Sequence, residues 1–425
     1  MLAYVLDAAR QATGERPLVV YSAATEALRD VFGAEADFAL QDEPRGTADA
    51  VRAALDVLPA GVGEIVVLSG DVPLIQPEDI DELIVARRET GAVMALITVE
   101  VFDPEGLGRV VRDADDRVTR VVEEKDATPE QRELAEINAG VYAFDVAWLR
   151  KRLPDVQPSE ATGELYLPVL IEFARADHRP VAALLVEEDG SLQGINDRSQ
   201  LASAEMDMRL HINERHMLAG VTMLDPTSTQ IDATVQLAED VTLEARVILR
   251  GTTSIGRDTV VRAGSQLFNA TVGERCLIWS SVIEDSVVGD GVSIGPFAHV
   301  RGGSEIGDGV QLGNFAEVKK SRVGRGSKQH HFSYIGDTQV GSAVNIGAGT
   351  ITANYDGKVK HATTIGDGAF IGSGTILRAP VTVGDGGYTG ANSVVTRDVP
   401  AGKLAVGVPA RIRERIVKPS AEEST

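Results

Sequence analysis

A run of branched aliphatic residues at every sixth position constrains the fold more than any other feature of the sequence. The central part of the run consists of Val282, Val288, Ile294, Val300, Ile306, Leu312 and Val318. A period of six fits neither an α-helix nor a simple alternating strand. It is typical of a solenoid in which each short strand points one aliphatic side chain inward. One strand cannot bury its side chain alone, so we predict stacked coils that share a continuous core.

The six-residue pattern extends over residues 231–267 before this run and over residues 365–395 after it. It slips twice by one residue, on either side of residues 329–337, which include His330 and His331. Breaks in an otherwise consistent pattern are expected at functional sites. Evenly spaced strands of a β-sandwich are the alternative, but three runs with one period favour the repeat architecture.

The composition limits the classes of partner. The chain has 425 residues, enough for two or three domains, and a formal net charge of −22. This charge argues against nucleic acid and anionic membranes as partners, although small anionic substrates need only local Lys and Arg.

Cys276 is the only cysteine, so we expect a small buried residue rather than a disulfide framework or a reactive thiol. With no signal-peptide pattern and no apolar run of about 18 residues, we expect a cytoplasmic protein.

The first 200 residues follow another pattern, in which apolar strand-like segments alternate with helical ones. This alternation predicts an α/β, Rossmann-like domain with a largely parallel sheet. Such sheets bind ligands beyond the carboxyl ends of their strands, where Gly70-Asp71 and Gly46-Thr47 lie. The predicted boundaries are residues 1–200 for this domain, 201–225 for a linker helix, 226–412 for the solenoid and 413–425 for a flexible tail.

Arg301 and Lys319 each follow an inward aliphatic residue, in a position where glycine is usual, and lie 18 residues apart. Eighteen residues make three six-residue strands, which is one coil of a three-sided prism. Both side chains should therefore emerge at the same corner in adjacent coils. Stacked cations repel each other unless an anion joins them, and a sugar phosphate would serve. Two solvated surface charges are the alternative.

His331 is the candidate general base for the solenoid domain. Histidine side chains ordinarily titrate near neutrality, as proton transfer at neutral pH requires. A surface histidine at a corner is the alternative, and the adjacent His330 supports that view. Residues 350–363 leave the six-residue pattern, so we predict a loop that projects from the coil.

Two sets of motifs resemble the family of bifunctional bacterial enzymes that make UDP-N-acetylglucosamine. In the second half of the chain they are Lys319-Lys320 and residues 331–337 (HFSYIGD), 345–350 (NIGAGT) and 354–357 (NYDG). In the first half they are Gln41, Gly46-Thr47 and residues 70–74 (GDVPL), 106–109 (GLGR), 123–128 (EEKDAT), 136–140 (EINAG) and 194–196 (GIN). The resemblance covers nearly the whole chain.

The resemblance implies a fold, an assembly and two reactions. The α/β nucleotidyltransferase domain would be followed by a left-handed parallel β-helix of hexapeptide repeats, and the chain would form a homotrimer. Glucosamine 1-phosphate would be N-acetylated from acetyl-CoA. The product would then receive the uridylyl group of UTP in a reaction that depends on Mg²⁺.

The resemblance also assigns residues to each site. In the acetyltransferase, His331 and Asn354 would be catalytic. The sugar phosphate would contact Arg301, Lys319, Tyr334 and Asn345. Acetyl-CoA would contact Ala348, Asn354, Tyr355, Ser373 and Ala391. The uridyltransferase site would comprise Gln41, Gly46, Thr47, Ser69, Gly70, Asp71, Gly108, Glu123, Asn138 and Asn196, with Asp71 and Asn196 as metal ligands.

The sequence departs from the family in its first half. A strand and the glycine-rich loop G-x-G-T-R-M, followed by P-K, open the family's domain and are not found here, which a mis-assigned start codon would explain. The loop's N–H groups cradle phosphates, and Val169 replaces a family Asp. We therefore predict impaired uridylyl transfer and unpaired strand edges in the sheet. A non-catalytic scaffold subunit is one alternative function, and an acyltransferase for a different sugar nucleotide is another.

Overall fold

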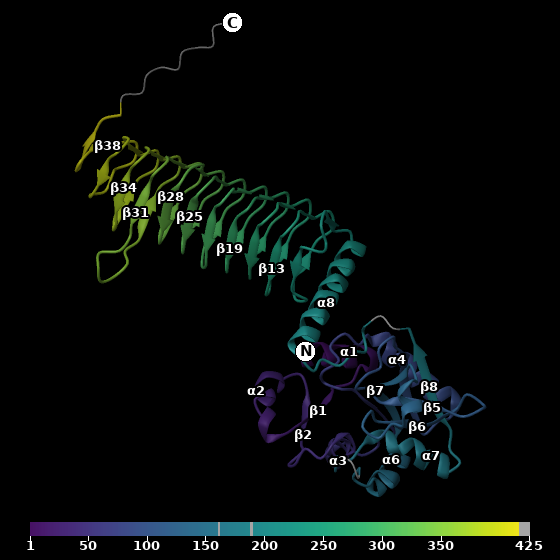
Figure 1. The fold of residues 1–425 in the computed structure, drawn as a ribbon. Coiled ribbons are helices and arrows are strands. Elements are labelled where there is room, and N and C mark those ends of the chain that lie inside the picture. Colours follow the sequence, from purple (N-terminus) through teal and green to yellow (C-terminus); the bar gives the residue numbers. More distant parts are fainter. Residues whose placement is uncertain (160–161, 188–189, 416–425) are drawn as a thin grey trace. The chain divides into compact units, whose positions relative to one another are not determined.

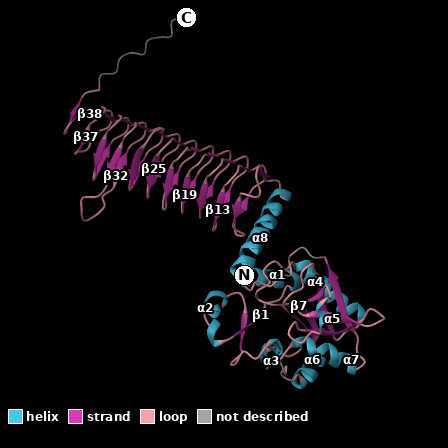
Figure 2. Cartoon of the chain, viewed as in Figure 1, coloured by secondary structure: helices cyan, strands magenta, loops and turns pink. Residues whose placement is uncertain are grey.

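The structure, a computed structural model, describes residues 1–159, 162–187 and 190–415 (Figure 1). The chain divides into two compact units, Met1–Glu205 and Met206–Thr425, and each is described by itself. The first unit mixes helices and strands, whereas the second consists almost entirely of short strands (Figure 2). No described helix combines the length and apolarity needed to cross a membrane.

The first unit alternates strands and helices along the chain, as predicted. Its helices are α1 (Leu2–Thr13), α2 (Leu28–Phe32), α3 (Thr47–Val57), α4 (Pro77–Thr90), α5 (Pro129–Arg132), α6 (Val146–Arg152) and α7 (Leu170–Ala176). Its strands are β1 (Leu18–Tyr21), β2 (Asp37–Leu40), β3 (Glu64–Val67), β4 (Met94–Glu100), β5 (Arg109–Arg112), β6 (Val118–Val122), β7 (Glu136–Asp145) and β8 (Val181–Val186). Local signals set these bounds: Pro77 begins α4, and Gly91 ends it in the left-handed conformation.

The main sheet of this unit is mixed, so the prediction of a largely parallel sheet is wrong. Strand β7 lies between β3 and β4 and runs antiparallel to both, while β4 pairs in parallel with β8. Strands β5 and β6 form an antiparallel pair, and β7 returns alongside β5. Only β5 and β6 are joined directly, by the short turn of residues 113–117, which antiparallel strands allow without a crossover helix.

Strands β1 and β2 form a separate two-stranded parallel sheet. Among the described residues, β1 pairs only with β2 and β3 pairs only with β7, so each keeps one unpaired edge. All four side chains of β3 are half-buried rather than buried. A small core of Leu6, Val19 and Ala36 supports the β1–β2 pair apart from the main core. The interruption of the sheet that the sequence predicts is therefore present.

The second unit begins within helix α8 (Arg198–Leu218). Ile212 of this helix joins the core of the β-helix, and Asn213 donates hydrogen bonds to the backbone carbonyls of Pro226 and Thr229 at 2.8 and 3.0 Å. The end of α8 thus covers the apolar side chains of the first coil, as terminal repeats of a solenoid must.

The coils wind around three parallel sheets, which we name faces 1, 2 and 3. Face 1 contains β10 (Gln230–Ile231), β13 (Ile248–Arg250), β16 (Gln266–Phe268), β19 (Val282–Glu284), β22 (His299–Arg301), β25 (Ala316–Lys319), β28 (Ser333–Gly336), β31 (Ile351–Ala353), β34 (Ile376–Arg378) and β37 (Val394–Val395). Face 2 contains β11 (Gln236–Leu237), β14 (Ser254–Ile255), β17 (Thr271–Val272), β20 (Val287–Val288), β23 (Glu305–Ile306), β26 (Arg322–Val323), β29 (Thr338–Val340), β32 (Thr363–Ile365) and β35 (Val381–Val383).

Face 3 contains β9 (Thr222–Met223), β12 (Thr242–Leu243), β15 (Val260–Val261), β18 (Leu277–Ile278), β21 (Ser293–Ile294), β24 (Gln311–Leu312), β27 (Lys328–Gln329), β30 (Asn345–Ile346), β33 (Phe370–Ile371), β36 (Tyr388–Thr389), β38 (Leu404–Gly407) and β39 (Ala410–Arg413). Each coil passes from face 3 to face 1 and then to face 2. We name the connection from face 3 to face 1 the 3/1 corner.

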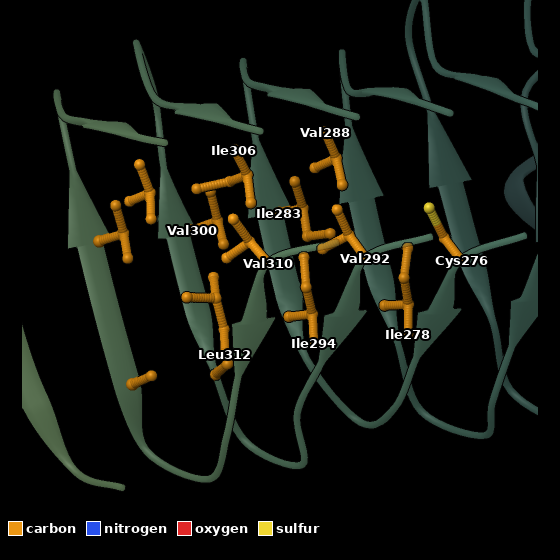
Figure 3. Close-up of a cluster of buried hydrophobic side chains, with 14 of the residues drawn as sticks. Cys276, Ile278, Ile283, Val288, Val292, Ile294, Val300, Ile306, Val310 and Leu312 are labelled. Carbon is orange, nitrogen blue, oxygen red and sulfur yellow. The ribbon is translucent and has the colours of Figure 1, made fainter. Parts of the chain in front are cut away.

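The predicted core is confirmed, with one correction to its register. Aliphatic side chains of successive coils stack in rows inside the prism (Figure 3). Ile283, not Val282, points inward, because it pairs with Leu267 across a coil of only 16 residues. The register therefore slips here as well as on either side of residues 329–337. Cys276 is a buried member of the same core, where burial raises the pKa of its thiol, as expected of an unreactive cysteine.

The last strands form a hairpin. Strand β39 pairs antiparallel with β38, so Arg411 and Arg413 belong to a strand. The guanidinium of Arg415 lies over the ring of Tyr388, 3.3 Å from its centroid. The rest of the predicted flexible tail, residues 416–425, lies outside the described residues.

Candidate active sites

Arg301 and Lys319 lie side by side on face 1. They are register partners on neighbouring strands β22 and β25, as the 18-residue spacing predicts. The guanidinium of Arg301 pairs with the Glu317 carboxylate at 2.9 Å, which raises the pKa of Arg301. In the next coil Gly336 takes the equivalent position, beside Lys319.

Gly336 makes room for the side chain of Tyr334. A Cβ atom at position 336 would collide with the Tyr334 hydroxyl, so the phenol lies across this glycine, beyond Lys319. The Asn354 amide lies 3.4 Å from the same hydroxyl and donates a short hydrogen bond to the Asp337 carboxylate. Four of the predicted residues, Arg301, Lys319, Tyr334 and Asn354, therefore share one face.

The predicted projecting loop follows strand β31 on this face (Figure 1). Its stem is held by a bridge between Tyr355 and Lys360, and Tyr355 is exposed. Lys360 turns back toward Lys319, and the side-chain hydrogen-bond contact with Lys319, together with the repulsion between the two ammonium groups, lowers the pKa of Lys360. Asp337 is the nearby countercharge. The loop thus adds a third cation to the Arg301–Lys319 pair.

His331 lies at the 3/1 corner, between β27 and β28, and is exposed. The predicted coenzyme residues Ala348, Ser373 and Ala391 occupy the same corner in the following coils. The backbone carbonyl of Ala348 accepts from Gly374, and that of Ser373 accepts from Asn392, in successive coils. His331 thus stands at the head of a column of small residues along the 3/1 corner.

Asn345 is the one predicted sugar-phosphate residue that lies elsewhere. It belongs to β30 on face 3, between Lys328 in the preceding coil and Phe370 in the next. The side chains of face 3 and face 1 point to different sides of the prism. Asn345 therefore does not line one surface with Arg301 and Lys319 within a single chain.

A buried polar contact behind His331 was not predicted from the sequence. Gln329 occupies the inward position that Leu312 holds in the preceding coil, and it is buried. Its amide donates to the Ser333 hydroxyl at 2.8 Å, which in turn donates to the backbone carbonyl of His331 at 2.9 Å. The interruption of the aliphatic pattern at position 329 was the available signal. Gln329 and Ser333 hold the corner that carries His331.

In the first unit, Gln41, Gly46 and Thr47 lie around the start of α3. The Gln41 amide donates to the Asp49 carboxylate at 2.9 Å, and Thr47 accepts from the backbone of Leu167 at 3.0 Å. Gly46 has a φ of 115° and packs so closely against Leu165 that a side chain would collide with its backbone. The structure therefore brings these three predicted residues together.

Gly108, Glu123 and Asn138 form a second group. The Asn138 backbone donates to the Gly108 carbonyl at 2.9 Å, and a Cβ at Gly108 would contact the Glu123 carboxylate. Burial raises the pKa of Glu123. The Asn138 amide donates to the hydroxyl of Tyr142 at 2.6 Å, and Tyr142 is buried. Tyr142 was not predicted as a site residue, because its sequence context is that of an ordinary strand residue.

Ser69, Gly70 and Asp71 follow the end of β3, as predicted. Ser69 lies against Gly140, which links it to the group around Asn138. Asp71 accepts a backbone hydrogen bond from Ile195 at 3.0 Å, and its carboxylate lies where a Cβ at Gly194 would approach to 3.3 Å. The structure thus brings Asp71 beside the Gly194–Asn196 segment although the two are far apart in sequence.

Asp71 and Asn196 are suited to Mg²⁺. Both offer oxygen atoms, the ligands that Mg²⁺ prefers, and Mg²⁺ keeps several waters, so few protein ligands are needed. Across the described residues, no group of three or more His, Cys, Asp or Glu side chains forms a metal cage.

Comparison with protein families defines the class of protein. A nucleotidyl transferase family matches residues 1–185, and the bacterial transferase hexapeptide family, of six repeats, matches residues 285–320 and 362–397. Together with the two units of the fold, these matches define a transferase that joins a nucleotidyltransferase domain to a hexapeptide β-helix.

Several full-length relatives match nearly the whole chain. The bifunctional protein GlmU of Shouchella clausii is 40% identical over 406 residues, which cover 96% of this chain and 89% of the relative. The GlmU proteins of Heliobacterium modesticaldum and Caldanaerobacter subterraneus are 42% and 41% identical, covering 96% of this chain and 89% and 88% of the relatives. The chain belongs to the family of bifunctional GlmU proteins. It is an enzyme with acetyltransferase and nucleotidyltransferase domains, so the alternative of a non-catalytic scaffold is set aside.

Proposed function

We propose that the chain serves UDP-N-acetylglucosamine synthesis, and that its β-helix transfers the acetyl group of acetyl-CoA to glucosamine 1-phosphate. The observation that supports this most is the cation group Arg301, Lys319 and Lys360 on face 1, with Tyr334 and Asn354 beside it. Three cations held together are stabilised by a dianion such as a sugar phosphate. With the phosphate fixed there, the sugar extends over face 1 toward the 3/1 corner.

His331 acts as the base in this reaction. The amine nitrogen of the sugar attacks the thioester carbonyl while His331 accepts the amine proton. The C–S bond then breaks, the departing thiolate takes the proton back from His331, and the coenzyme leaves as a thiol. Asn354 contributes an amide donor where negative charge develops on the carbonyl oxygen. The column of Ala348, Ser373 and Ala391 leaves space beside His331 for the extended coenzyme.

Acceptor choice tests this assignment. Glucosamine without the phosphate should be acetylated at least about 100-fold less efficiently than glucosamine 1-phosphate, because the binding energy of the cation group is lost. The measurement is kcat/KM for both acceptors, for the parent chain and for Arg301→Ala. In the variant the difference between the acceptors should shrink. Equal kcat/KM values for the two acceptors in the parent chain would assign the cations to another ligand.

Gln329→Leu should lower acetyl transfer without lowering the stability of the fold. Leucine fills the inward position as in the neighbouring coil and removes a buried amide oxygen that has no hydrogen-bond partner. Removing an unsatisfied buried polar group is worth about 1–3 kcal/mol, so the melting temperature should hold or rise. Acetyl transfer should fall roughly 10- to 100-fold, because the corner carrying His331 loses its anchor. Full activity with a raised melting temperature would show that Gln329 does not position His331.

A second copy of the chain completes the acetyltransferase site. Asn345 lies on face 3, whereas Arg301 and Lys319 lie on face 1, so a substrate that touches all three bridges two copies. A contact between unlike faces closes into a ring when every copy repeats it. For three-sided prisms we propose a ring of three, the homotrimer implied by the family.

We further propose that the first unit transfers the uridylyl group of UTP to N-acetylglucosamine 1-phosphate. Gly108, Glu123 and Asn138 would hold the sugar, and Gln41, Gly46 and Thr47 the uracil. Asp71 and Asn196 would hold Mg²⁺, which when bound stabilises the charge that develops on the phosphates. Tyr142 fixes the amide of Asn138 in the sugar group.

Uridylyl transfer by these 425 residues should be slow. The sheet is interrupted between β1 and β3, and the sequence has no glycine-rich loop to donate N–H groups to the triphosphate. Loss of one such donor costs about 10²–10³-fold in rate, and here several are missing together. Pyrophosphate release from UTP by the purified chain should therefore be at least about 100-fold slower than its CoA release. Comparable rates, abolished by Asp71→Ala, would contradict the proposal.

A further inference from the structure

A buried carboxylate holds the amide of Gln41 in the first unit. Asp49 lies in the first turn of α3 and is only 9% exposed, which is rare for an acidic residue. Its Oδ2 atom accepts a hydrogen bond from the Gln41 amide nitrogen at 2.9 Å, and its Oδ1 atom lies 3.4 Å from the Arg52 guanidinium. The same Gln41 nitrogen lies 3.4 Å from the carbonyl oxygen of Gly46. The amide nitrogen of Gln41 thus has two protein acceptors.

These contacts determine which atom of the Gln41 amide is offered to a ligand. A carboxylate and a backbone carbonyl only accept hydrogen bonds, so the amide must turn its nitrogen toward Asp49 and Gly46. Both N–H groups of the amide are then directed at the protein, and the amide oxygen is the atom left for a ligand. Gln41 is half-buried rather than buried, so a ligand has access to it. Gln41 therefore presents an acceptor.

We propose that Asp49 determines which nucleobase this site accepts, because it fixes Gln41 as a hydrogen-bond acceptor. The inference rests on the proposed uridylyl transfer, in which Gln41, Gly46 and Thr47 hold the uracil. Uracil carries an N3–H donor, whereas the N3 atom of cytosine is itself an acceptor. The Gln41 oxygen therefore pairs with uracil but faces cytosine with no proton between the two acceptors. A site that leaves polar groups unpaired in this way rejects the wrong substrate. Asp49 is thus a specificity-determining residue that does not itself touch the base.

A purely structural role for Asp49 is the alternative. An acidic residue in the first turn stabilises a helix, because it faces the positive end of the helix dipole. That role requires neither the burial of Asp49 nor its hydrogen bond with Gln41. It would also affect stability alone, whereas the orientation of the Gln41 amide changes the preference between two bases. The ratio of the dissociation constants for a uridine and a cytidine nucleotide therefore distinguishes the two roles.

Asp49→Asn tests the proposal in the full chain, because it keeps the size of the side chain and replaces one acceptor with a donor. Arg52 only donates, so it should hold the oxygen of the introduced amide and turn its nitrogen toward Gln41. The Gln41 amide should then flip and offer its nitrogen to the base. Dissociation constants of UDP and CDP are measured by titration calorimetry, because uridylyl transfer itself should be slow. The matched control is Asp42→Asn, the same change at the exposed carboxylate next to Gln41 in the chain.

The parent chain and the control should bind UDP at least about tenfold more tightly than CDP, the effect of one hydrogen bond made or left unpaired. In Asp49→Asn this ratio should fall at least about tenfold, while the melting temperature stays close to that of the parent. Gln41→Ala should bring the two dissociation constants within about threefold of each other, which assigns the preference to this site. An Asp49→Asn chain that keeps the parental ratio would overturn the inference, as would a parent chain that binds both nucleotides equally. If the parent binds neither nucleotide, the proposed uridylyl function fails and the inference fails with it.

Discussion

Replacing His331 with alanine should reduce acetyl transfer by about 10²–10⁴-fold, the contribution of a positioned general base. His331 is exposed at the 3/1 corner, and its backbone is held by Ser333 and Gln329 rather than by its own ring. Removing the imidazole should therefore leave the coil and the assembly intact. The measurement is kcat for CoA release at saturating substrates, with molar mass and melting temperature recorded for the same sample.

The adjacent His330 supplies the matched control. Its Nε2 atom contacts the Gln311 amide oxygen at 2.7 Å on face 3, away from face 1. His330→Ala should keep kcat within about threefold of the parent, as expected for a surface substitution. Near-parental turnover by His331→Ala would remove His331 from the role of base. An equal loss in both variants would indicate a structural effect of the corner.

Mixed assemblies of two inactive variants should regain activity. Lys319→Ala removes a cation of face 1, and Asn345→Ala removes the amide of face 3, so each variant alone should lose most of its acetyl transfer. When the two variants assemble together, some sites combine an intact face 1 from one copy with an intact face 3 from the next. A ring of three that contains both variants has one such site, so activity should return to about one third of the parental value.

The mixing experiment has an internal control. Arg301 and Lys319 are register partners on face 1 of the same copy. Co-expressed Arg301→Ala and Lys319→Ala chains should therefore stay inactive, because every site lacks one of the two cations. The two chains carry different affinity tags, and only assemblies that retain both tags are assayed. If the Lys319→Ala and Asn345→Ala mixture is no more active than the average of its parts, each site lies within one copy.

The parts of the fold that follow from a repeating local pattern could be predicted from the sequence. The stacked positions of Arg301 and Lys319 follow from the 18-residue coil, and the column of Ser373 and Ala391 follows in the same way. The pattern fails where the coil shortens: Val282 fits the six-residue spacing, yet Ile283 points inward because that coil has only 16 residues. Spacing also did not show that Asn345 lies on a different face from Lys319, because the intervening coils change length.

The pairing of distant strands and the buried polar contacts could not be predicted from the sequence. Strand β7 reads as one more apolar strand, and nothing local shows that it runs antiparallel between β3 and β4. The approach of Asp71 to the Gly194–Asn196 segment depends on the whole fold of the unit. Tyr142 acquires its role because β7 bulges at Gly140, which has a φ of 74°, so that the Asn138 amide four residues away lies 2.6 Å from the Tyr142 hydroxyl. Such contacts depend on tertiary packing, which single-sequence propensities do not encode.

The most direct test is the release of free CoA by the purified chain when it is given acetyl-CoA and glucosamine 1-phosphate. CoA should appear in a one-to-one ratio with N-acetylated sugar phosphate, and omission of the acceptor should stop it. His331→Ala, still assembled, should release at least about 100-fold less CoA in the same time. CoA release by the parent chain that does not depend on glucosamine 1-phosphate, or none at all, would contradict the acetyltransferase assignment.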